Sequence, residues 1–451
     1  MNEKNTMEGL KARRIALQVL RQVTEEGAYA SLALDTALRN CGMGSSDRKL
    51  VSRLVYDTLD RLNYLDHALA QVMARQDTDI KLRNILRLGA CQILLEDRIP
   101  ESAATNLSVQ LCTELGMPGL KGVCNGILRN LVRKKDQLTF PDPKKEPVQA
   151  ASVLYGIPEW LYHRIYNDYG EETKQIISFR NLDQGWLLRP NLTRIDDAGF
   201  EALLDRKVWV KEKTDLPHAW RITGAMDIAG DSDYRQGYYS IQSGGSMIAC
   251  LAVGVRRGQQ ILDCCAAPGG KTCSLSEMMN GTGRVQAWDI HEHRVRLIEA
   301  QAQRLGLENI RPMVRDALKP RDELVASMDA VLLDAPCSGT GFLAEKPDIR
   351  LHITKEGTDE MIRTQQKMLD TVCTYVKPGG TLVYSTCSIL KDENERQAEV
   401  FLEQHPEFEE TDLPETIPER YKRHKTRGLQ ILEHRDGLEG FYVIRMRKKH
   451  E

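Results

Sequence analysis

The sequence lacks several features that mark large classes of protein. No apolar run approaches the roughly 20 residues that a membrane-spanning helix needs, and residues 1–5 begin no apolar stretch of the signal-peptide type. No Cys-x-x-Cys pair occurs, so the usual spacing of a structural zinc site is missing and we expect no metal. The 11 cysteines follow no regular framework, which indicates reduced thiols and a cytoplasmic protein without a membrane segment.

The whole chain also lacks a strong net charge of either sign, but residues 1–135 are basic. The 451 residues carry a formal net charge of −2. Residues 1–135 nevertheless contain 20 lysine and arginine residues against 15 acidic ones. A basic module on a mildly acidic chain indicates a polyanionic partner, although a solvated helix surface would carry the same charges.

Residues 1–140 are expected to form an all-helical bundle. Apolar residues recur at helical spacing in several segments, namely 15–23, 50–59, 82–93, 107–115 and 123–132. Prolines at both ends of residues 141–147 predict an extended linker after the bundle.

Residues 148–236 are expected to form a small α+β connector domain. A helical stretch starts at Pro158 and reaches about residue 179. Apolar, β-branched and aromatic residues at 186–191 and 208–210 predict two strands.

Residues 237–451 alternate between short apolar runs and helical segments. Strands are predicted at 260–263, 285–289, 311–316, 330–334, 381–385 and 441–446, with helices such as 291–305 and 355–376 between them. This alternation is typical of a doubly wound, mainly parallel α/β sheet. The fold class is therefore α/β.

Two cysteines follow neighbouring apolar runs of this third region. Cys337 comes after Asp334-Ala335-Pro336, and Cys387 comes after Ser385-Thr386. Ligands of open α/β sheets bind beyond the carboxyl ends of the strands, so both thiols are candidates for chemistry. The alternative for either cysteine alone is a small buried apolar side chain.

The first predicted strand continues into a glycine-containing turn, Cys265-Ala266-Ala267-Pro268-Gly269-Gly270-Lys271. Glycines at such a turn let the backbone approach a ligand closely. A P-loop would need a glycine five residues before Gly270, where Cys265 stands, and a dinucleotide fingerprint would need G-x-G-x-x-G. The sequence therefore favours neither ATP nor NAD.

Acidic residues end four of the predicted strands, and they are Asp263, Asp289, Asp316 and Asp334. A carboxylate after the second strand is placed to accept hydrogen bonds from ribose hydroxyls. One after the third strand can accept from an adenine amino group, and one at the first turn can face a sulfonium. This set predicts S-adenosylmethionine as the cofactor, although a single loop aspartate often only caps a helix.

The thiols have a chemical use beside that cofactor. C5 of a pyrimidine is a poor nucleophile, and a thiolate that adds to C6 pushes electron density onto C5. The chemistry also needs a donor at the N3 edge of the base, which Asp334 supplies if it is protonated when the base is bound. Methyltransferases that act on amino groups need no thiol and present Pro-Pro-aromatic where this chain has Asp334-Ala335-Pro336-Cys337. Carbon methylation is therefore favoured over nitrogen methylation.

Three motifs in order resemble the RNA 5-methylcytosine methyltransferase family, the NOL1/NOP2/Sun group. They are the turn from Cys265 to Lys271, Asp334-Ala335-Pro336-Cys337-Ser338-Gly339-Thr340-Gly341, and Ser385-Thr386-Cys387-Ser388. The resemblance implies a class I Rossmann-like methyltransferase domain over residues 237–451. It implies that Cys387 attacks C6 and that Cys337 assists release of the product. It also implies that the turn residues with Asp289, Asp316 and Asp334 contact the cofactor or the target base, and that Lys271 lies in the site.

The first region resembles a NusB-like RNA-binding domain. The segments that carry this likeness are Ser102-Ala103-Ala104-Thr105-Asn106-Leu107-Ser108-Val109 and Gly122-Val123-Cys124-Asn125-Gly126-Ile127-Leu128-Arg129. A NusB-like bundle ahead of this catalytic domain is the arrangement of 16S rRNA cytosine-C5 methyltransferases. It implies a monomer whose partner is RNA, either 16S rRNA or a small-subunit assembly intermediate.

Two segments depart from the family pattern, at Gln242-Ser243-Gly244-Gly245-Ser246 and at Phe342-Leu343-Ala344-Glu345-Lys346-Pro347-Asp348-Ile349. Glu345 lowers the positive charge expected near RNA phosphates.

Four alternative functions stay open at this point: methylation of a different RNA, a non-catalytic RNA-binding factor, a methyltransferase for amino groups, and a P-loop ATPase.

Overall fold

The computed structural model describes residues 3–39, 41–75, 77–180, 185–224, 227–422 and 427–450. By their internal contacts the residues group into two compact units. The first contains residues 1–178 together with 343–353, and the second contains residues 179–342 and 354–451. The three-part division at residues 140 and 236 stays a prediction.

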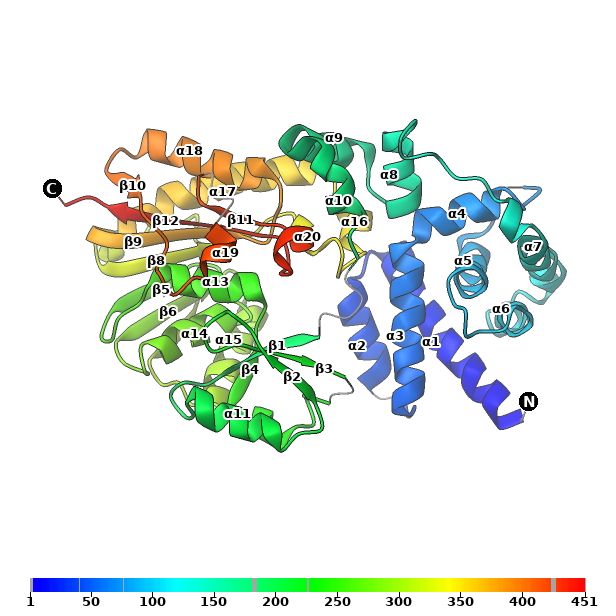
Figure 1. Cartoon of the computed structure of the whole chain (residues 1–451), viewed down its shortest axis with the longest axis horizontal. Coiled ribbons are helices and arrows are strands. Elements are labelled where there is room, and N and C mark those ends of the chain that lie inside the picture. The colour runs from blue at the N-terminus through cyan, green and yellow to red at the C-terminus, as the bar shows by residue number, and fades with distance from the viewer. Residues whose placement is uncertain are drawn as a thin grey trace. The chain divides into compact units, whose positions relative to one another are not determined.

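The first unit is a bundle of helices (Figure 1). Its α-helices are α1 (Glu3–Glu26), α2 (Ala30–Arg39), α3 (Ser45–Asp60), α4 (Leu62–Ala70), α5 (Ile80–Leu94), α6 (Glu101–Glu114), α7 (Lys121–Lys134), α8 (Pro147–Tyr155), α9 (Glu159–Tyr169), α10 (Thr173–Ser178) and α16 (Ile349–His352). Helix α5 is the central one, because it contacts α1, α3, α4, α6 and α7 and buries most of its residues. The all-helical prediction is confirmed, but α2 and α4 were not among the predicted segments.

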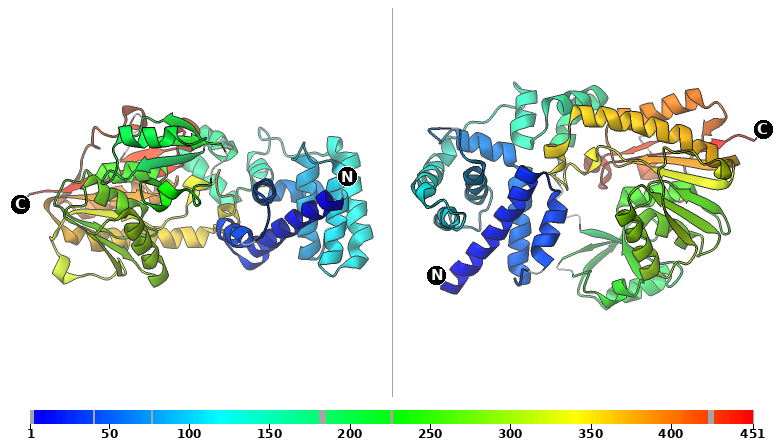
Figure 2. Two further views of the ribbon diagram at one scale, coloured as in Figure 1. Left: turned by 90° about the horizontal axis from the view of Figure 1, so that it is seen from below. Right: turned by 180° about the vertical axis from the view of Figure 1, so that it is seen from behind.

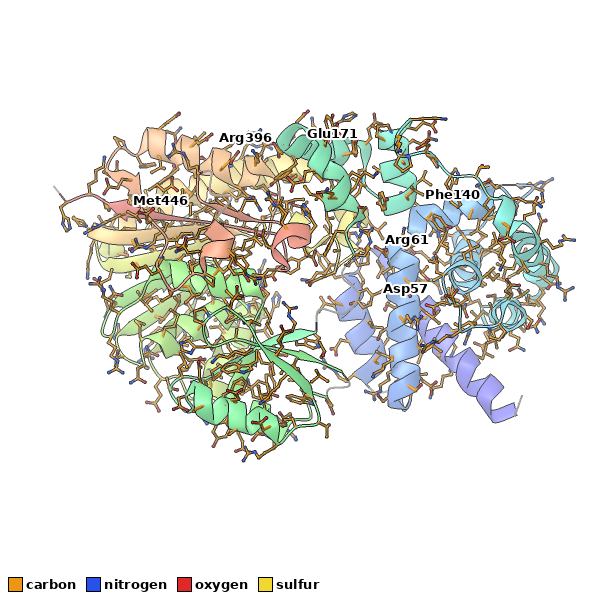
Figure 3. The ribbon with its side chains drawn as sticks, viewed as in Figure 1. Asp57, Arg61, Phe140, Glu171, Arg396 and Met446 are labelled. Carbon is orange, nitrogen blue, oxygen red and sulfur yellow. The ribbon has the colours of Figure 1, made fainter. Side chains whose placement is uncertain are left out.

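The predicted extended linker is wrong. Residues 143–145 form a turn, in which Lys145 and Glu146 donate backbone hydrogen bonds to the carbonyl of Asp142. Phe140, just before this turn, stacks on Tyr64 of α4 with ring centroids 4.4 Å apart (Figure 3). The aspartate between two prolines closes the turn, since its backbone and side-chain oxygens accept from the residues that follow it.

Residues 343–353 pack within the first unit through two buried charged side chains. Arg350 of α16 forms an ion pair with Asp60 at 2.9 Å and donates to the backbone carbonyl of Tyr155 at 3.0 Å. Asp348 accepts a hydrogen bond from the backbone N–H of Ala30, the first residue of α2, at 3.0 Å. The segment that departs from the family pattern is therefore anchored on the helical unit by its own charges.

The second unit contains a small and a large sheet. The small sheet has strand order β2-β3-β1-β4, is antiparallel, and packs against α11 (Asp197–Asp205). Its strands are β1 (Trp186–Pro190), β2 (Val210–Lys213), β3 (Trp220–Thr223) and β4 (Tyr239–Ile241), with α12 (Ser232–Arg235) between β3 and β4. The strand predicted at 208–210 begins only at Val210, because residues 206–209 still belong to the turn after α11.

The large sheet runs in the order β10-β12-β9-β8-β5-β6-β7, and β11 pairs with β12. Its strands are β5 (Gln260–Asp263), β6 (Arg284–Asp289), β7 (Ile310–Val314), β8 (Met328–Asp334), β9 (Val376–Thr386), β10 (Phe408–Glu410), β11 (Leu429–Ile431) and β12 (Phe441–Lys448). Strands β5 to β9 are parallel, whereas β10, β11 and β12 pair in antiparallel fashion. The predicted doubly wound, mainly parallel sheet is confirmed.

Helices cover both faces of this sheet (Figure 1; Figure 2). They are α13 (Gly244–Val253), α14 (Gly270–Met278) and α15 (Glu292–Leu305) on one face and α17 (Lys355–Val372) and α18 (Glu395–Gln404) on the other, with α19 (Glu419–Lys422) and α20 (Glu433–Asp436) near β11. Successive strand residues serve opposite cores: Leu332 packs with the α13–α15 face and Leu333 with the α17–α18 face. Runs of apolar residues are required because both faces are buried.

The ends of one strand and one helix differ from the prediction. Strand β7 ends at Val314, so Asp316 lies two residues beyond the sheet rather than at its edge. Helix α17 ends at Val372, and a 3-10 turn over residues 373–375 leads directly into β9.

Among the described residues, no helix is both long and apolar enough to cross a membrane.

Candidate active site

The two cysteines predicted from strand ends lie side by side. Their Sγ atoms are 3.2 Å apart, at hydrogen-bond distance for sulfur. Strands β8 and β9 are parallel neighbours with Asp334 opposite Ser385, and the chain then continues to Cys337 and Cys387 at the same edge. Both side chains are half-buried. The pKa of the Cys337 thiol is raised, chiefly by its hydrogen bond with Cys387 and then by burial.

A buried carboxylate that the sequence did not single out holds the two cysteine loops together. Glu393 is fully buried, and its oxygens accept from the backbone N–H of Ser338 at 2.8 Å and from the hydroxyl of Ser388 at 2.5 Å. The amide of Gln365 donates to the same carboxylate at 3.1 Å. Because Ser338 follows one cysteine and Ser388 follows the other, Glu393 positions both. The signal in the sequence was an acid six residues after Cys387, hidden in a charged run typical of an exposed segment.

Gly341 brings the same loops into close contact. Its N–H donates to the carbonyl of Cys387 at 2.9 Å, and its carbonyl accepts from the N–H of Gly440 at 2.9 Å. A Cβ atom at Gly341 would lie 1.8 Å from the carbonyl oxygen of Gly440. Only glycine allows this approach, which explains the last residue of the motif that contains Cys337.

Lys271 and Asp334 form an ion pair beside the cysteines. The Nζ atom of Lys271 lies 2.7 Å from one oxygen of Asp334, and the hydroxyl of Ser385 donates to the other oxygen at 2.7 Å. Burial by itself would lower the pKa of Lys271, but the neighbouring charge of Asp334 outweighs it and the pKa is raised. Lys271 is therefore charged, and it stands as an ammonium donor beside the Asp334 carboxyl.

Asp263 and the glycine-containing turn lie at the first strand end. The Asp263 carboxyl is fully buried and accepts from the hydroxyl of Thr272 at 2.6 Å. Burial raises its pKa to about 7, and the charge of Asp334 acts in the same direction. Burial also raises the pKa of Cys265, followed by the charges of Asp263, Asp334 and Asp289. The structure therefore brings these three carboxylates together around Cys265.

The other residues of the glycine-containing turn differ in exposure, and Asp289 lies at the end of the next strand. Ala266 and Gly269 are buried, Ala267 and Gly270 are half-buried, and Pro268 is exposed. Asp289 is buried at the end of β6, accepts from the backbone N–H of His291 at 3.0 Å and lies 3.4 Å from the Arg294 guanidinium.

Asp316 lies two residues beyond the end of β7, unlike the three carboxylates that end a strand. It is half-exposed and accepts a hydrogen bond from the backbone N–H of Leu318 at 3.0 Å.

Arg189 of β1 is a second charged residue that the sequence analysis did not identify. It is buried and donates to the carboxylate of Glu277 in α14 and to the side chain of Gln242. It also reaches the backbone carbonyl of Gly270 at 3.5 Å. Arg189 thus holds α14, the helix that starts at the turn, through these hydrogen bonds. An arginine within an apolar strand was the available signal, but its partner lies 88 residues away.

This edge of the sheet fits S-adenosylmethionine in its chemistry. One oxygen of buried Asp263 has no hydrogen-bond partner among the described residues. Nothing lies within 4 Å of the position that a Cβ of Gly270 would occupy, so the backbone is open there. Carboxylates suit a cationic sulfonium and ribose hydroxyls, and an open glycine turn admits a ligand. In the described part of the chain, no cluster of three or more His, Cys, Asp or Glu residues could hold a metal ion.

Comparison with known families agrees with this geometry. Residues 250–447 match the family model described as "16S rRNA methyltransferase RsmB/F", and residues 10–133 match the NusB family. A protein from Bacillus subtilis (strain 168) described as "Probable ribosomal RNA small subunit methyltransferase B" is 32% identical over 448 residues, covering 98% of this chain and all of that protein. The "Ribosomal RNA small subunit methyltransferase B" of Escherichia coli O1:K1 / APEC is 30% identical over 450 residues, with 97% and 98% covered.

Solved structures share the fold. The structure described as "Crystal Structure of PH0851" has a TM-score of 0.82 at 24% identity and covers 97% of this chain and 99% of that one. A methyltransferase homolog from Pyrococcus horikoshii has a TM-score of 0.56 at 25% identity and covers 65% of this chain and 96% of its own. The family predicted from the motifs is thereby confirmed. The chain belongs to the RsmB family of S-adenosylmethionine-dependent ribosomal RNA methyltransferases.

Proposed function

We propose that this chain transfers a methyl group to C5 of a cytosine in 16S rRNA through a covalent bond between a cysteine and C6. The observation that carries the proposal is the pair of thiols, 3.2 Å apart, at the sheet edge that also holds the Lys271–Asp334 ion pair. A methyltransferase for amino groups has no use for two thiols at this place. Methylation of carbon does, because C5 must first be activated.

Cys387 is the nucleophile in this scheme and Cys337 is its partner. The raised pKa of Cys337 keeps that thiol neutral, so it serves as a hydrogen-bond donor to the sulfur of Cys387. The Cys387 thiolate adds to C6, which makes C5 nucleophilic. After C5 has received the methyl group, a water molecule takes the C5 proton, the electron pair of that C–H bond forms the C5–C6 double bond, and the C6–S bond breaks so that Cys387 leaves as a thiolate. Donation from Cys337 stabilises this leaving group.

Lys271 and Asp334 are proposed to hold the polar edge of the cytosine. The Asp334 carboxyl accepts from the amino group of the base, and the Lys271 ammonium is the donor available for N3 as electron density moves into the ring. This assignment gives the donor role considered for Asp334 to Lys271, whose Nζ atom lies 2.7 Å from the Asp334 carboxyl.

Asp263, Asp289, Asp316 and the turn residues from Cys265 to Gly270 are proposed to hold S-adenosylmethionine. When bound, this cofactor supplies an electrophilic methyl group. The buried, unpartnered oxygen of Asp263 and the open backbone at Gly270 are the features of the described residues that support this site. Asp316, being half-exposed beyond β7, is proposed only as an outer contact.

The RNA class is proposed from two observations. Both relatives named above are described as small-subunit methyltransferases and are covered over nearly their whole length. The NusB-like unit also carries the basic residues noted from the sequence, and a polyanion suits them. We propose a cytoplasmic monomer acting on 16S rRNA or on a small-subunit assembly intermediate.

The test is nucleoside analysis of the product. Purified chain and S-adenosylmethionine are incubated with deproteinised 16S rRNA and, in a parallel arm, with small subunits from cells that lack the enzyme. The proposal expects 5-methylcytosine in at least one arm and none with Cys387→Ser protein, and bisulfite sequencing then locates the base. N4-methylcytosine, or 5-methylcytosine that persists with Cys387→Ser, contradicts the scheme.

A further inference from the structure

A cavity of about 570 Å³ opens between α6 and α7 in the first unit. Helix α6 contributes Ser102, Thr105 and Asn106 to its lining. Helix α7 contributes Gly126, Arg129 and Arg133, of which both arginines are exposed. Cavities of this size hold small ligands or parts of larger ones.

The charge of this cavity is positive. Helix α7 contains four basic residues and no acidic residue. The one acid in the lining is Glu101, and Lys135 neutralises it with an ion pair at 2.7 Å. Within the described residues, Arg129 and Arg133 form no hydrogen bond or ion pair with another group, so both guanidinium groups remain available. They are one helical turn apart and therefore face the same cavity.

The remaining lining offers hydrogen bonds and open backbone rather than apolar anchors. The Ser102 hydroxyl and the Asn106 amide are exposed, and neither has a hydrogen-bond partner in the described ranges of the chain. No atom lies within 4 Å of the position that a Cβ of Gly126 would occupy, so a ligand can approach the helix backbone there. Among the residues that the structure describes, no aromatic side chain lines the cavity, although aromatic anchors usually dominate protein–protein contacts.

We propose that this α6–α7 cavity binds the sugar–phosphate backbone of the RNA substrate. That the bound RNA is the substrate rests on the proposed function. That the cavity binds an RNA backbone does not depend on methylation. Arg129 and Arg133 contact phosphate oxygens through their paired N–H groups. Ser102 and Asn106 supply the weaker hydrogen bonds to phosphate and ribose that fix the position of the strand.

The test measures RNA binding by the full chain without cofactor. Filter binding of transcribed 16S rRNA is compared for the wild-type protein, Arg129→Ala/Arg133→Ala and a matched control, Lys144→Ala/Lys145→Ala. The control removes the same charge from two exposed lysines in the same unit. The cavity variant should bind roughly tenfold more weakly, and its plot of log affinity against log salt should be shallower by about 1 to 2 because two phosphate contacts are lost. The control should change affinity by less than about twofold.

A second variant tests the cavity without altering charge. Gly126→Leu fills the open space, adds a good helix former and should also weaken binding. Circular dichroism confirms that each variant is folded. Unchanged affinity and salt dependence in the arginine variant, or an equal loss in the lysine control, overturns the inference. Absence of 5-methylcytosine with wild-type protein would overturn the proposed function instead, because binding is measured without methylation.

Discussion

The Sγ atoms of Cys337 and Cys387 lie 3.2 Å apart although the residues are 50 positions apart in the chain. Parallel pairing of β8 and β9 sets this distance, because Asp334 and Ser385 stand opposite each other just before the two cysteines. Glu393 then ties the two loops together through Ser338 and Ser388. The two thiols are therefore one functional unit, and changes to either should alter the chemistry of the other.

Replacing Cys337 should trap the reaction. In Cys337→Ala protein, Cys387 can still attack C6, but the donor to its departing sulfur is gone, so a covalent RNA–protein adduct should accumulate. Denaturing gel electrophoresis after incubation with RNA and S-adenosylmethionine detects it. Cys387→Ala protein should form neither adduct nor product, and Cys41→Ala, in the other unit, should behave as wild type. An adduct with Cys387→Ala would show that the nucleophile is misassigned.

Removing the charge of Glu393 should make Cys337 more acidic. The Glu393 carboxylate contributes to the raised pKa of Cys337, after the hydrogen bond with Cys387 and burial. In a Cys387→Ala background, Glu393→Gln should therefore shift alkylation of Cys337 to lower pH, as measured peptide by peptide with iodoacetamide. The glutamine keeps the size of the side chain, and the serine hydroxyls can rotate to accept from its amide. A shift to higher pH would contradict the electrostatic assignment.

Asp263 should make the stability of the second unit depend on pH. Its pKa rises from an ordinary 3.8 to about 7 because the carboxyl is buried. The folded state then holds a proton that the unfolded state has lost, so the free energy of unfolding falls as pH rises from about 4 to about 7. Asp263→Asn removes this fall and should be more stable than wild type at pH 8 by up to about 4 kcal/mol.

Urea unfolding at pH 5 and pH 8 measures the effect of Asp263→Asn. The advantage of the variant should shrink at pH 5. The same variant should bind S-adenosylmethionine more weakly in equilibrium dialysis, since an amide cannot supply the negative charge. A variant that is equally stable at both pH values relative to wild type would show that Asp263 does not titrate in this range.

Arg189 should stabilise the helix behind the glycine-containing turn. Arg189→Met leaves Glu277 buried without its cation and should lower the free energy of unfolding by about 3 kcal/mol. Burial already raises the pKa of Glu277, and Arg189 opposes this rise, so the loss of stability without Arg189 should be larger at pH 8 than at pH 5. Adding Glu277→Gln should restore most of the stability. Failure of the double variant to recover would indicate that Arg189 acts through packing alone.

Arg350 should anchor residues 343–353 within the helical unit. Its side chain is 2% exposed and pairs with Asp60. Arg350→Met removes one cation paired with Asp60 and the donor to three backbone carbonyls, those of Asp60, Tyr155 and Leu343, and local opening should become easier by about 2–3 kcal/mol. Hydrogen exchange of peptides from 343–353 should accelerate by roughly a hundredfold. Arg396→Met, which removes an exposed i,i+4 pair elsewhere, is the control and should leave these peptides unchanged.

The elements predicted well were those with strong local patterns. Strand 260–263 and the end of β8 at Asp334 match the structure, because buried parallel strands require unbroken apolar runs. Helices α2 and α4 were missed because each is short. The linker was misread because the turn centred on Asp142 depends on one side chain rather than on composition.

The sequence by itself determined the order of the motifs, the family, and the expectation that Cys337 and Cys387 meet at one sheet edge. Those properties follow from local chemistry and from the fixed direction of parallel strands. Only the tertiary structure decided the ion pair of Lys271 with Asp334, the contacts of Glu393 and Arg189, and the position of Asp316 two residues beyond the end of β7. Each depends on partners far away in the chain, and hydrogen bonds and burial act through space rather than along the sequence.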